Sequence, residues 1–168
     1  SGPSAHHSLE QVFSLDRESF YFVAAGSSIG IFHELGYLPD ALVLLERGSN
    51  LYKDIQYLLQ LKVDLSQITL IASTTIDARI PPLFKDVVYF ARPVAAITPL
   101  IDAELNSSIS LLQSGPESAN AALEAVSFLN PSSVLMVGID CGSTKRALVR
   151  SEHALGDQDR ELNIPLAG

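Results

Sequence analysis

The sequence predicts an α/β domain in three layers, with helices covering both faces of a mainly parallel sheet. Short runs of β-branched and aromatic residues alternate with segments of helical periodicity, and Gly, Pro, Asp or Asn separate them. Several of the short runs are apolar without interruption, which is typical of strands buried on both sides. We therefore expect about five or six strands, most of them joined by helices.

Four strands are expected in the first half of the chain, where the apolar runs cover residues 20–25, 41–45, 68–72 and 87–90. A helix that begins at Ser4 or Ser8 and ends near Leu15 precedes the first of them. Two further helices, over residues 27–35 and 50–62, separate the next strands. Gly36 is a suitable left-handed terminator for the helix over residues 27–35.

The second half predicts a helix over residues 97–105, a weaker strand over 108–112, an alanine-rich helix over 117–129 and a strand over 134–139. The last of these is the clearest strand pattern in the sequence. We expect residues 20–25, 41–45 and 134–139 to be central, fully buried strands that run parallel to one another.

Residues 1–168 show no internal repeat and no linker, so we expect one domain. The polar stretch over residues 142–161 lacks periodicity, and we expect it to be a mobile loop when no ligand is bound. The sequence starts with Ser-Gly-Pro-Ser and without Met, so we expect it to be a piece of a longer protein.

Composition excludes several classes of partner. Nineteen acidic residues against eleven basic ones give a net charge of −8, which repels phosphate backbones and anionic lipids. The longest apolar runs fall far short of the roughly 20 residues that a membrane span needs. A single Cys forms no internal disulfide. We therefore expect a cytoplasmic protein with neither nucleic acid nor membrane as its partner.

Candidate binding residues follow the predicted strands, because ligands of open parallel sheets bind at the carboxyl ends of the strands. Small hydroxyl and glycine residues there allow the backbone to approach phosphate or sugar oxygens closely. The strand ends carry Gly26 and Ser27, then Glu46, then Ser73, and finally Asp140. We expect an anionic ligand at this edge of the sheet.

Two Gly-Pro turns that open helices are further candidates for holding nucleotide phosphates. They are Gly2-Pro3-Ser4 and the turn that begins with Ser114 and Gly115. The alternative for each is a turn that only caps its helix. The sequence contains no Walker motif and no complete Gly-x-Gly-x-x-Gly fingerprint, which argues against a P-loop NTPase or an NAD enzyme.

His153 lies in the long polar loop beyond Asp140, where an imidazole could act as a general acid or base near neutral pH. The alternative is a solvated loop histidine. Carboxylates that could hold Mg²⁺ are few, namely Glu46, Asp77 and Asp140, so a metal is an open question.

Taken in order, these segments resemble the glycosyltransferase-like domain of motility-associated factor (Maf) proteins, within the 6-hydroxymethylpterin diphosphokinase MptE-like family. The resemblance covers nearly the whole chain. It rests on the opening Gly-Pro-Ser and on four further segments: residues 36–40, Glu46-Arg47, residues 138–140 and His153-Ala154. Residues 114–142 are also similar to a block of the bacterial sialyltransferases that use CMP-activated sugars.

The resemblance implies a Rossmann-like fold and a glycosyltransferase that moves a CMP-activated nonulosonic acid, of the pseudaminic or legionaminic type, to Ser or Thr of flagellin or another protein acceptor. It implies that Gly2, Pro3 and Ser4 border the donor phosphate, with Ser114 and Gly115 nearby and Asp140 toward the ribose or base. His153 matches the general base of the sialyltransferases, although the tyrosines that those enzymes place beyond the Gly-Ile-Asp segment are absent here.

Two other functions stay open at this point. One is a pterin diphosphokinase that uses ATP and Mg²⁺, which would need basic residues to clamp a triphosphate. The other is a catalytically silent domain that binds a nucleotide sugar or a partner protein. The Glu46-Arg47 pair follows the Maf form of the family, so the transferase is the leading hypothesis.

Overall fold

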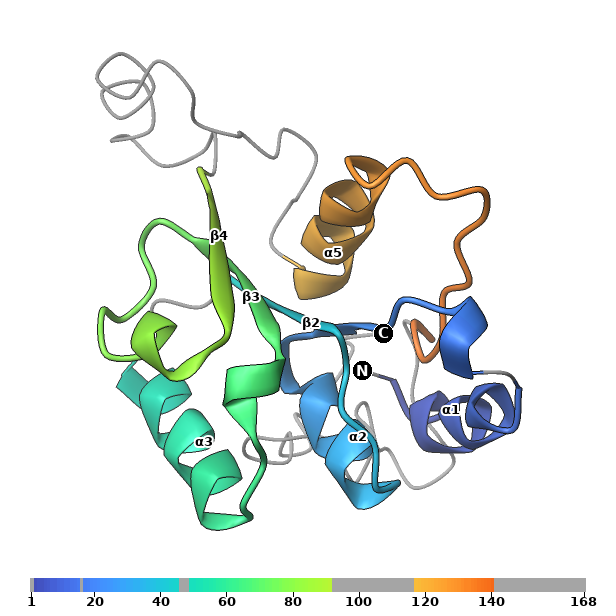
Figure 1. The fold of residues 1–168 in the computed structure, drawn as a ribbon, viewed down its shortest axis with the longest axis horizontal. Helices are drawn as coiled ribbons and strands as arrows, with labels where there is room; N and C mark the ends of the chain where they lie inside the picture. The colour runs from blue at the N-terminus through green and yellow to red at the C-terminus, as the bar shows by residue number, and fades with distance from the viewer. Residues whose placement is uncertain (1, 16, 46–48, 92–116, 141–168) are drawn as a thin grey trace, which may run out of the picture.

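The structure is a computed structural model, and it describes residues 2–15, 17–45, 49–91 and 117–140. Its sheet contains four parallel strands in the order β1-β2-β3-β4 (Figure 1). The strands are β1 (Val23–Ala25), β2 (Ala41–Leu44), β3 (Thr69–Ser73) and β4 (Asp86–Phe90). Ala41 of β2 is in register with Val23 on one side and with Thr69 on the other. The predicted α/β fold with a parallel sheet is confirmed.

The helices connect and cover these strands. They are α1 (Ala5–Phe13), α2 (Ile29–Glu34), α3 (Ser49–Gln60) and α5 (Ser118–Ser127), with short 3₁₀ helices at Arg17–Ser19, Gly26–Ser28, Leu65–Gln67 and Pro81–Leu83. Within the described ranges, no helix is both long and apolar enough to cross a membrane. The predicted helix over 97–105, the strand over 108–112 and the loop over 142–161 lie outside the described residues.

Strand β2 is buried on both of its faces, as the middle layer of a three-layer fold requires. Side chains alternate along β2, so that Leu42 and Leu44 enter one apolar cluster while Val43 enters another with Leu45. The first cluster includes residues of α1, α2 and α3, and the second includes Ala121 of α5. Figure 1 shows α5 set apart from α2 and α3 across the sheet. Strand β2 is fully buried, and the prediction of a central strand there is confirmed.

The turn between α2 and β2 fixes the amino ends of β1 and β2. Gly36 ends α2 with a φ of 75°, as predicted. Further along the same turn, Asp40 Oδ2 accepts a hydrogen bond of 2.7 Å from the Phe22 N–H, and the Asp40 N–H donates to the Phe22 carbonyl at 2.8 Å. Asp40 therefore has a structural role at the edge of the sheet opposite the strands' carboxyl ends.

Two strand predictions need correction. Residues 134–139 form no strand, and Leu135 is 63% exposed, because no strand of the described sheet pairs with them. An apolar pattern predicts the tendency to extend, but a strand also requires a hydrogen-bonded neighbour, which the pattern cannot supply. The strand predicted over residues 20–25 shortens to Val23–Ala25 and is the edge strand of the described sheet, where we expected a central one.

Candidate functional site

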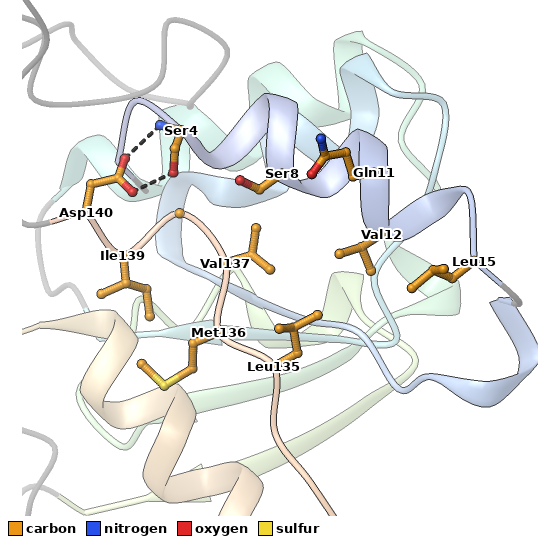
Figure 2. A pocket seen from close by; sticks show the side chains of 11 residues that line it. Ser4, Ser8, Gln11, Val12, Leu15, Leu135, Met136, Val137, Ile139 and Asp140 are labelled. Atoms are coloured by element: carbon orange, nitrogen blue, oxygen red, sulfur yellow. Dashed lines mark hydrogen bonds between the residues drawn. The ribbon is translucent and has the colours of Figure 1, made fainter.

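Two segments from the two ends of the described chain meet at the start of α1. The Gly2 N–H donates to the Gly138 carbonyl at 2.6 Å. The Ser4 N–H donates to Asp140 Oδ2 at 2.7 Å, and Ser4 Oγ donates to Asp140 Oδ1 at 2.5 Å (Figure 2). We call this arrangement of Gly2, Ser4, Gly138 and Asp140 the clasp.

The clasp requires glycine at two positions. Gly138 has a φ of 70°, and a Cβ atom there would collide with the side chain of Ala5 in the first turn of α1. A Cβ atom on Gly2 would collide with the carboxylate of Asp140. The two glycines therefore allow the chain segments to approach closely enough for Ser4 and Asp140 to bond.

The carboxylate of Asp140 lies at the amino end of α1, where the helix dipole favours negative charge. Donation from the Ser4 hydroxyl, followed by donation from the Ser4 N–H, lowers the pKa of Asp140 below its ordinary value. The carboxylate is thus ionised at neutral pH. Its oxygens keep further lone pairs, so Asp140 can accept additional hydrogen bonds from a ligand that carries hydroxyl groups.

A groove of about 640 Å³ extends from the clasp along α1. One side is the α1 face with Ser4, Ser8, Gln11, Val12 and Leu15, and the other side is formed by residues 135–140. Figure 2 shows the polar clasp at one end of this groove and Leu15 with Leu135 toward the other. The site therefore combines a charged, hydrogen-bonding end with an apolar end.

Ser8 and Gln11 were not predicted as site residues. They lie four and seven residues after Ser4, and this spacing places all three on one face of a helix. The spacing alone could have identified them, once Ser4 was taken as a binding residue. Gln11 also contacts the ring of His7, with 3.1 Å between the two Nε2 atoms.

The other predicted residues at strand ends have different environments. Gly26 adopts a φ of 55° directly after β1, and Ser27 follows it in a 3₁₀ turn. The hydroxyl that bonds the backbone in this turn belongs to Ser28, which accepts from the Ala25 N–H at 2.8 Å. Ser73 is only 1% exposed, and its Oγ lies 2.9 Å from Thr75 Oγ1, so its hydroxyl already has a partner within the protein.

Glu46, Ser114, Gly115 and His153 lie outside the described residues. Of the carboxylates considered for Mg²⁺, Asp77 is bonded to the guanidinium of Arg79, which lowers its pKa to about 2, and Asp140 is bonded to Ser4. Across the part of the chain that the structure describes, no three His, Cys, Asp or Glu side chains form a group able to hold a metal. The described carboxylates thus form no metal centre of their own.

Comparison with known proteins identifies proteins to which this chain is similar. The family model described as 6-hydroxymethylpterin diphosphokinase MptE-like matches residues 1–146. Among solved structures, the chain is similar to the MAf glycosyltransferase from Magnetospirillum magneticum AMB-1, with a TM-score of 0.76 and 29% sequence identity. That similarity covers 88% of this chain and 23% of the longer one. No curated protein sequence matches the chain.

Proposed function

The chain belongs to the 6-hydroxymethylpterin diphosphokinase MptE-like family, and on this basis we propose that it is the donor-binding domain of a glycosyltransferase. The similarity to a MAf glycosyltransferase over 88% of the chain supports this class of reaction. We propose a CMP-activated nonulosonic acid as the donor and a Ser or Thr of flagellin, or of another protein, as the acceptor. The Maf-like motifs at Glu46-Arg47 and residues 138–140 support these finer assignments.

The proposal rests mainly on the clasp between Ser4 and Asp140, which lies at one end of the groove along α1. A nucleotide offers an anionic phosphate and a ribose with two hydroxyl groups. We expect the phosphate to lie beside Gly2 and Pro3. The ionised Asp140, which already occupies the amino end of α1, accepts hydrogen bonds from ribose hydroxyls. Because Ser4 Oγ donates its proton to Asp140, the lone pairs of Ser4 Oγ remain free to accept a hydrogen bond from a ligand hydroxyl.

In the proposed reaction, the acceptor hydroxyl oxygen attacks the anomeric carbon of the donor sugar. The bond between that carbon and the phosphate oxygen breaks, and CMP leaves with the electron pair. His153 takes the proton of the acceptor hydroxyl as general base. The residues that hold the donor nucleotide are Gly2, Pro3, Ser4, Gly26, Ser27, Glu46, Ser114, Gly115 and Asp140. Hydrogen-bond donors among them stabilise the charge on the departing phosphate.

The family description also supports an alternative, a diphosphokinase that uses ATP and Mg²⁺. Such an enzyme needs cationic side chains to neutralise a triphosphate. Among the arginines near the strand ends, the structure describes Arg79, and its guanidinium is bonded to Asp77 and lies 3.9 Å over the ring of Tyr52. This pairing makes Arg79 less available to a triphosphate. The similarity to a MAf glycosyltransferase favours the transferase. A third possibility is a silent domain that binds a nucleotide sugar or a partner without catalysis.

Ligand-dependent thermal unfolding separates the three functions. CMP should raise the melting temperature if the chain is the donor domain, since a ligand that binds the native state stabilises it. Stabilisation by ATP with Mg²⁺, and not by CMP, would support the kinase. A transfer assay with the longer protein, a CMP-activated sugar and flagellin then tests catalysis, and CMP binding without transfer would leave the silent domain.

A further inference from the structure

Ala5 follows Ser4 in the sequence and is the first residue of α1. Its side chain is a single methyl group that is only 2% exposed, and it belongs to the same apolar cluster as Leu9 of this helix. A methyl group offers a ligand neither a hydrogen bond nor a charge. Any part that Ala5 plays at the clasp must therefore come from its size and its place.

The backbone of Gly138 lies directly against this methyl group. A Cβ atom on Gly138 would overlap the Ala5 Cβ atom and would lie 2.8 Å from the Ala5 Cα atom, which is closer than carbon atoms approach without a shift of the chain. Space for another atom is thus absent between these two residues. The Ala5 methyl group limits how near residues 138–140 come to α1, and its small size permits the close approach.

The hydrogen bonds of the clasp depend on this separation. The Gly2 N–H donates to the Gly138 carbonyl at 2.6 Å, and the Ala5 N–H donates to the Gly2 carbonyl at 3.2 Å. Asp140, two residues beyond Gly138, accepts from Ser4 at 2.7 and 2.5 Å. Because hydrogen bonds weaken beyond roughly 3.2 Å, a displacement of the Asp140 carboxylate by about 1 Å would carry both of its bonds to Ser4 past this limit.

We propose that Ala5 is a positioning residue of the candidate site, whose methyl group sets the place of Gly138 and, through it, the place of the Asp140 carboxylate. Ala5 acts through Asp140 and makes no contact with the ligand. The inference rests on the proposed function in one respect, namely that the donor contacts Asp140. The alternative is that Ala5 only fills space in the apolar cluster, in which case a larger residue would lower stability without moving the carboxylate.

Two buried alanines on different helices separate these roles. Ala5→Val enlarges the side chain that lies against Gly138. Ala121→Val adds the same two carbon atoms to a fully buried alanine of α5, which packs in the other apolar cluster with Val43. In each folded variant, NMR titration of the carboxyl carbon measures the pKa of Asp140, and calorimetry measures the Kd for CMP.

Ala5→Val should raise the pKa of Asp140 toward its ordinary value, because the hydrogen bonds from Ser4 are the main causes of its lowering. The Kd for CMP should rise by about two- to tenfold, which corresponds to the loss of one hydrogen bond. Ala121→Val should lower the melting temperature and change neither quantity. An unchanged pKa of Asp140 in a folded Ala5→Val protein would overturn the proposal, and so would equal changes in the two variants.

A second set of variants keeps the test decisive if Ala5→Val fails to fold. Gly138→Ala should raise the pKa of Asp140 through its collision with Ala5. Adding Ala5→Gly removes the nearest of the colliding atoms, so part of this rise should be reversed. Gly36→Ala, which has a similar φ but no neighbour within 4 Å, should leave the pKa of Asp140 unchanged. A double variant without any recovery would contradict the proposal.

The two measured quantities distinguish a failure of this inference from a failure of the proposed function. If the unsubstituted protein does not bind CMP, the proposed function fails, while the pKa of Asp140 still decides the role of Ala5. If Ala5→Val raises that pKa and leaves the Kd for CMP unchanged, Ala5 positions the carboxylate as proposed, and the donor binds elsewhere.

Discussion

The carboxylate of Asp140 accepts hydrogen bonds from both the N–H and the hydroxyl of Ser4, a residue 136 positions away in the sequence. Ser4 precedes α1 but makes no side-chain cap bond to its own helix. Asp140 takes the place that a local capping residue usually has, since its carboxylate lies at the amino end of the helix. The position of α1 thus depends on residues 138–140. A ligand bound beside Asp140 would contact both α1 and these residues.

Close packing at the clasp can be tested with two glycines that share a backbone conformation. Gly138 and Gly36 have φ values of 70° and 75°, but only Gly138 has a neighbour, Ala5, in the space of a Cβ atom. Gly36→Ala should cost about 1–2 kcal/mol of unfolding free energy through backbone strain alone. Gly138→Ala should cost more, because steric collision adds to the strain. Urea denaturation of both variants provides the measurement, and equal losses would show that α1 moves away without cost.

The lowered pKa of Asp140 predicts a pH-dependent contribution to stability. Because the folded state holds this carboxyl below its unfolded pKa of about 3.9, the contribution is present above that pH and is lost as the pH falls through the folded pKa. The difference in unfolding free energy between the unsubstituted protein and Asp140→Asn should therefore be larger at about pH 6 than at about pH 3. In a Ser4→Ala background this pH dependence should shrink, since Ser4 is the main cause of the shift. A difference that does not change with pH would contradict the assignment.

Asp40 belongs to the segment 36–40 that resembles the family, but its hydrogen bonds to Phe22 give it a structural role that can be tested. Removing its carboxylate in Asp40→Ala leaves the Phe22 N–H without this acceptor, which should cost about 1–3 kcal/mol of unfolding free energy. The affinity for CMP should stay unchanged, because Asp40 lies at the amino ends of the strands. Denaturation and calorimetry on the same preparation separate the two effects. A large loss of CMP affinity in a folded Asp40→Ala protein would place the ligand at the opposite edge of the sheet.

Periodicity predicted the parts of the fold that depend on local sequence. The strand over residues 41–45 and the helix over 117–129 appear within a few residues of their expected bounds, and Gly36 ends α2 as expected. The pattern of residues 134–139 was misleading because pairing is a property of two segments, and a single apolar run does not contain its partner.

The candidate site was only partly predictable for a related reason. The motifs singled out Ser4 and Asp140 separately, but no spacing rule relates residues 136 positions apart, so their direct bond required the three-dimensional structure. Ser73 shows the opposite case. Its position at the end of β3 suggested a ligand contact, whereas its burial and its bond to Thr75 depend on how the following turn folds back.

The catalytic proposal predicts a specific kinetic result for His153→Ala. If His153 removes the acceptor proton, turnover should fall by about 10²- to 10⁴-fold, because general base catalysis acts in the transition state. The Kd for CMP should hardly change, since donor binding needs no proton transfer. Initial rates with flagellin and calorimetry with CMP measure the two quantities. Full turnover by the variant would assign the base elsewhere.

Donor binding at the clasp can be tested against a second serine with the same local chemistry. Ser66 donates from both its hydroxyl and its N–H to Asp64, as Ser4 does to Asp140, but this pair lies at the amino end of β3. Ser4→Ala should weaken CMP binding by roughly 0.5–1.5 kcal/mol, through the lost hydroxyl and the less firmly held carboxylate. Ser66→Ala should leave the Kd for CMP unchanged, although it loses an equivalent bond. Calorimetry on both variants decides the matter, because equal effects would mean that the loss reflects general stability, and no effect from Ser4→Ala would remove the clasp from the donor site.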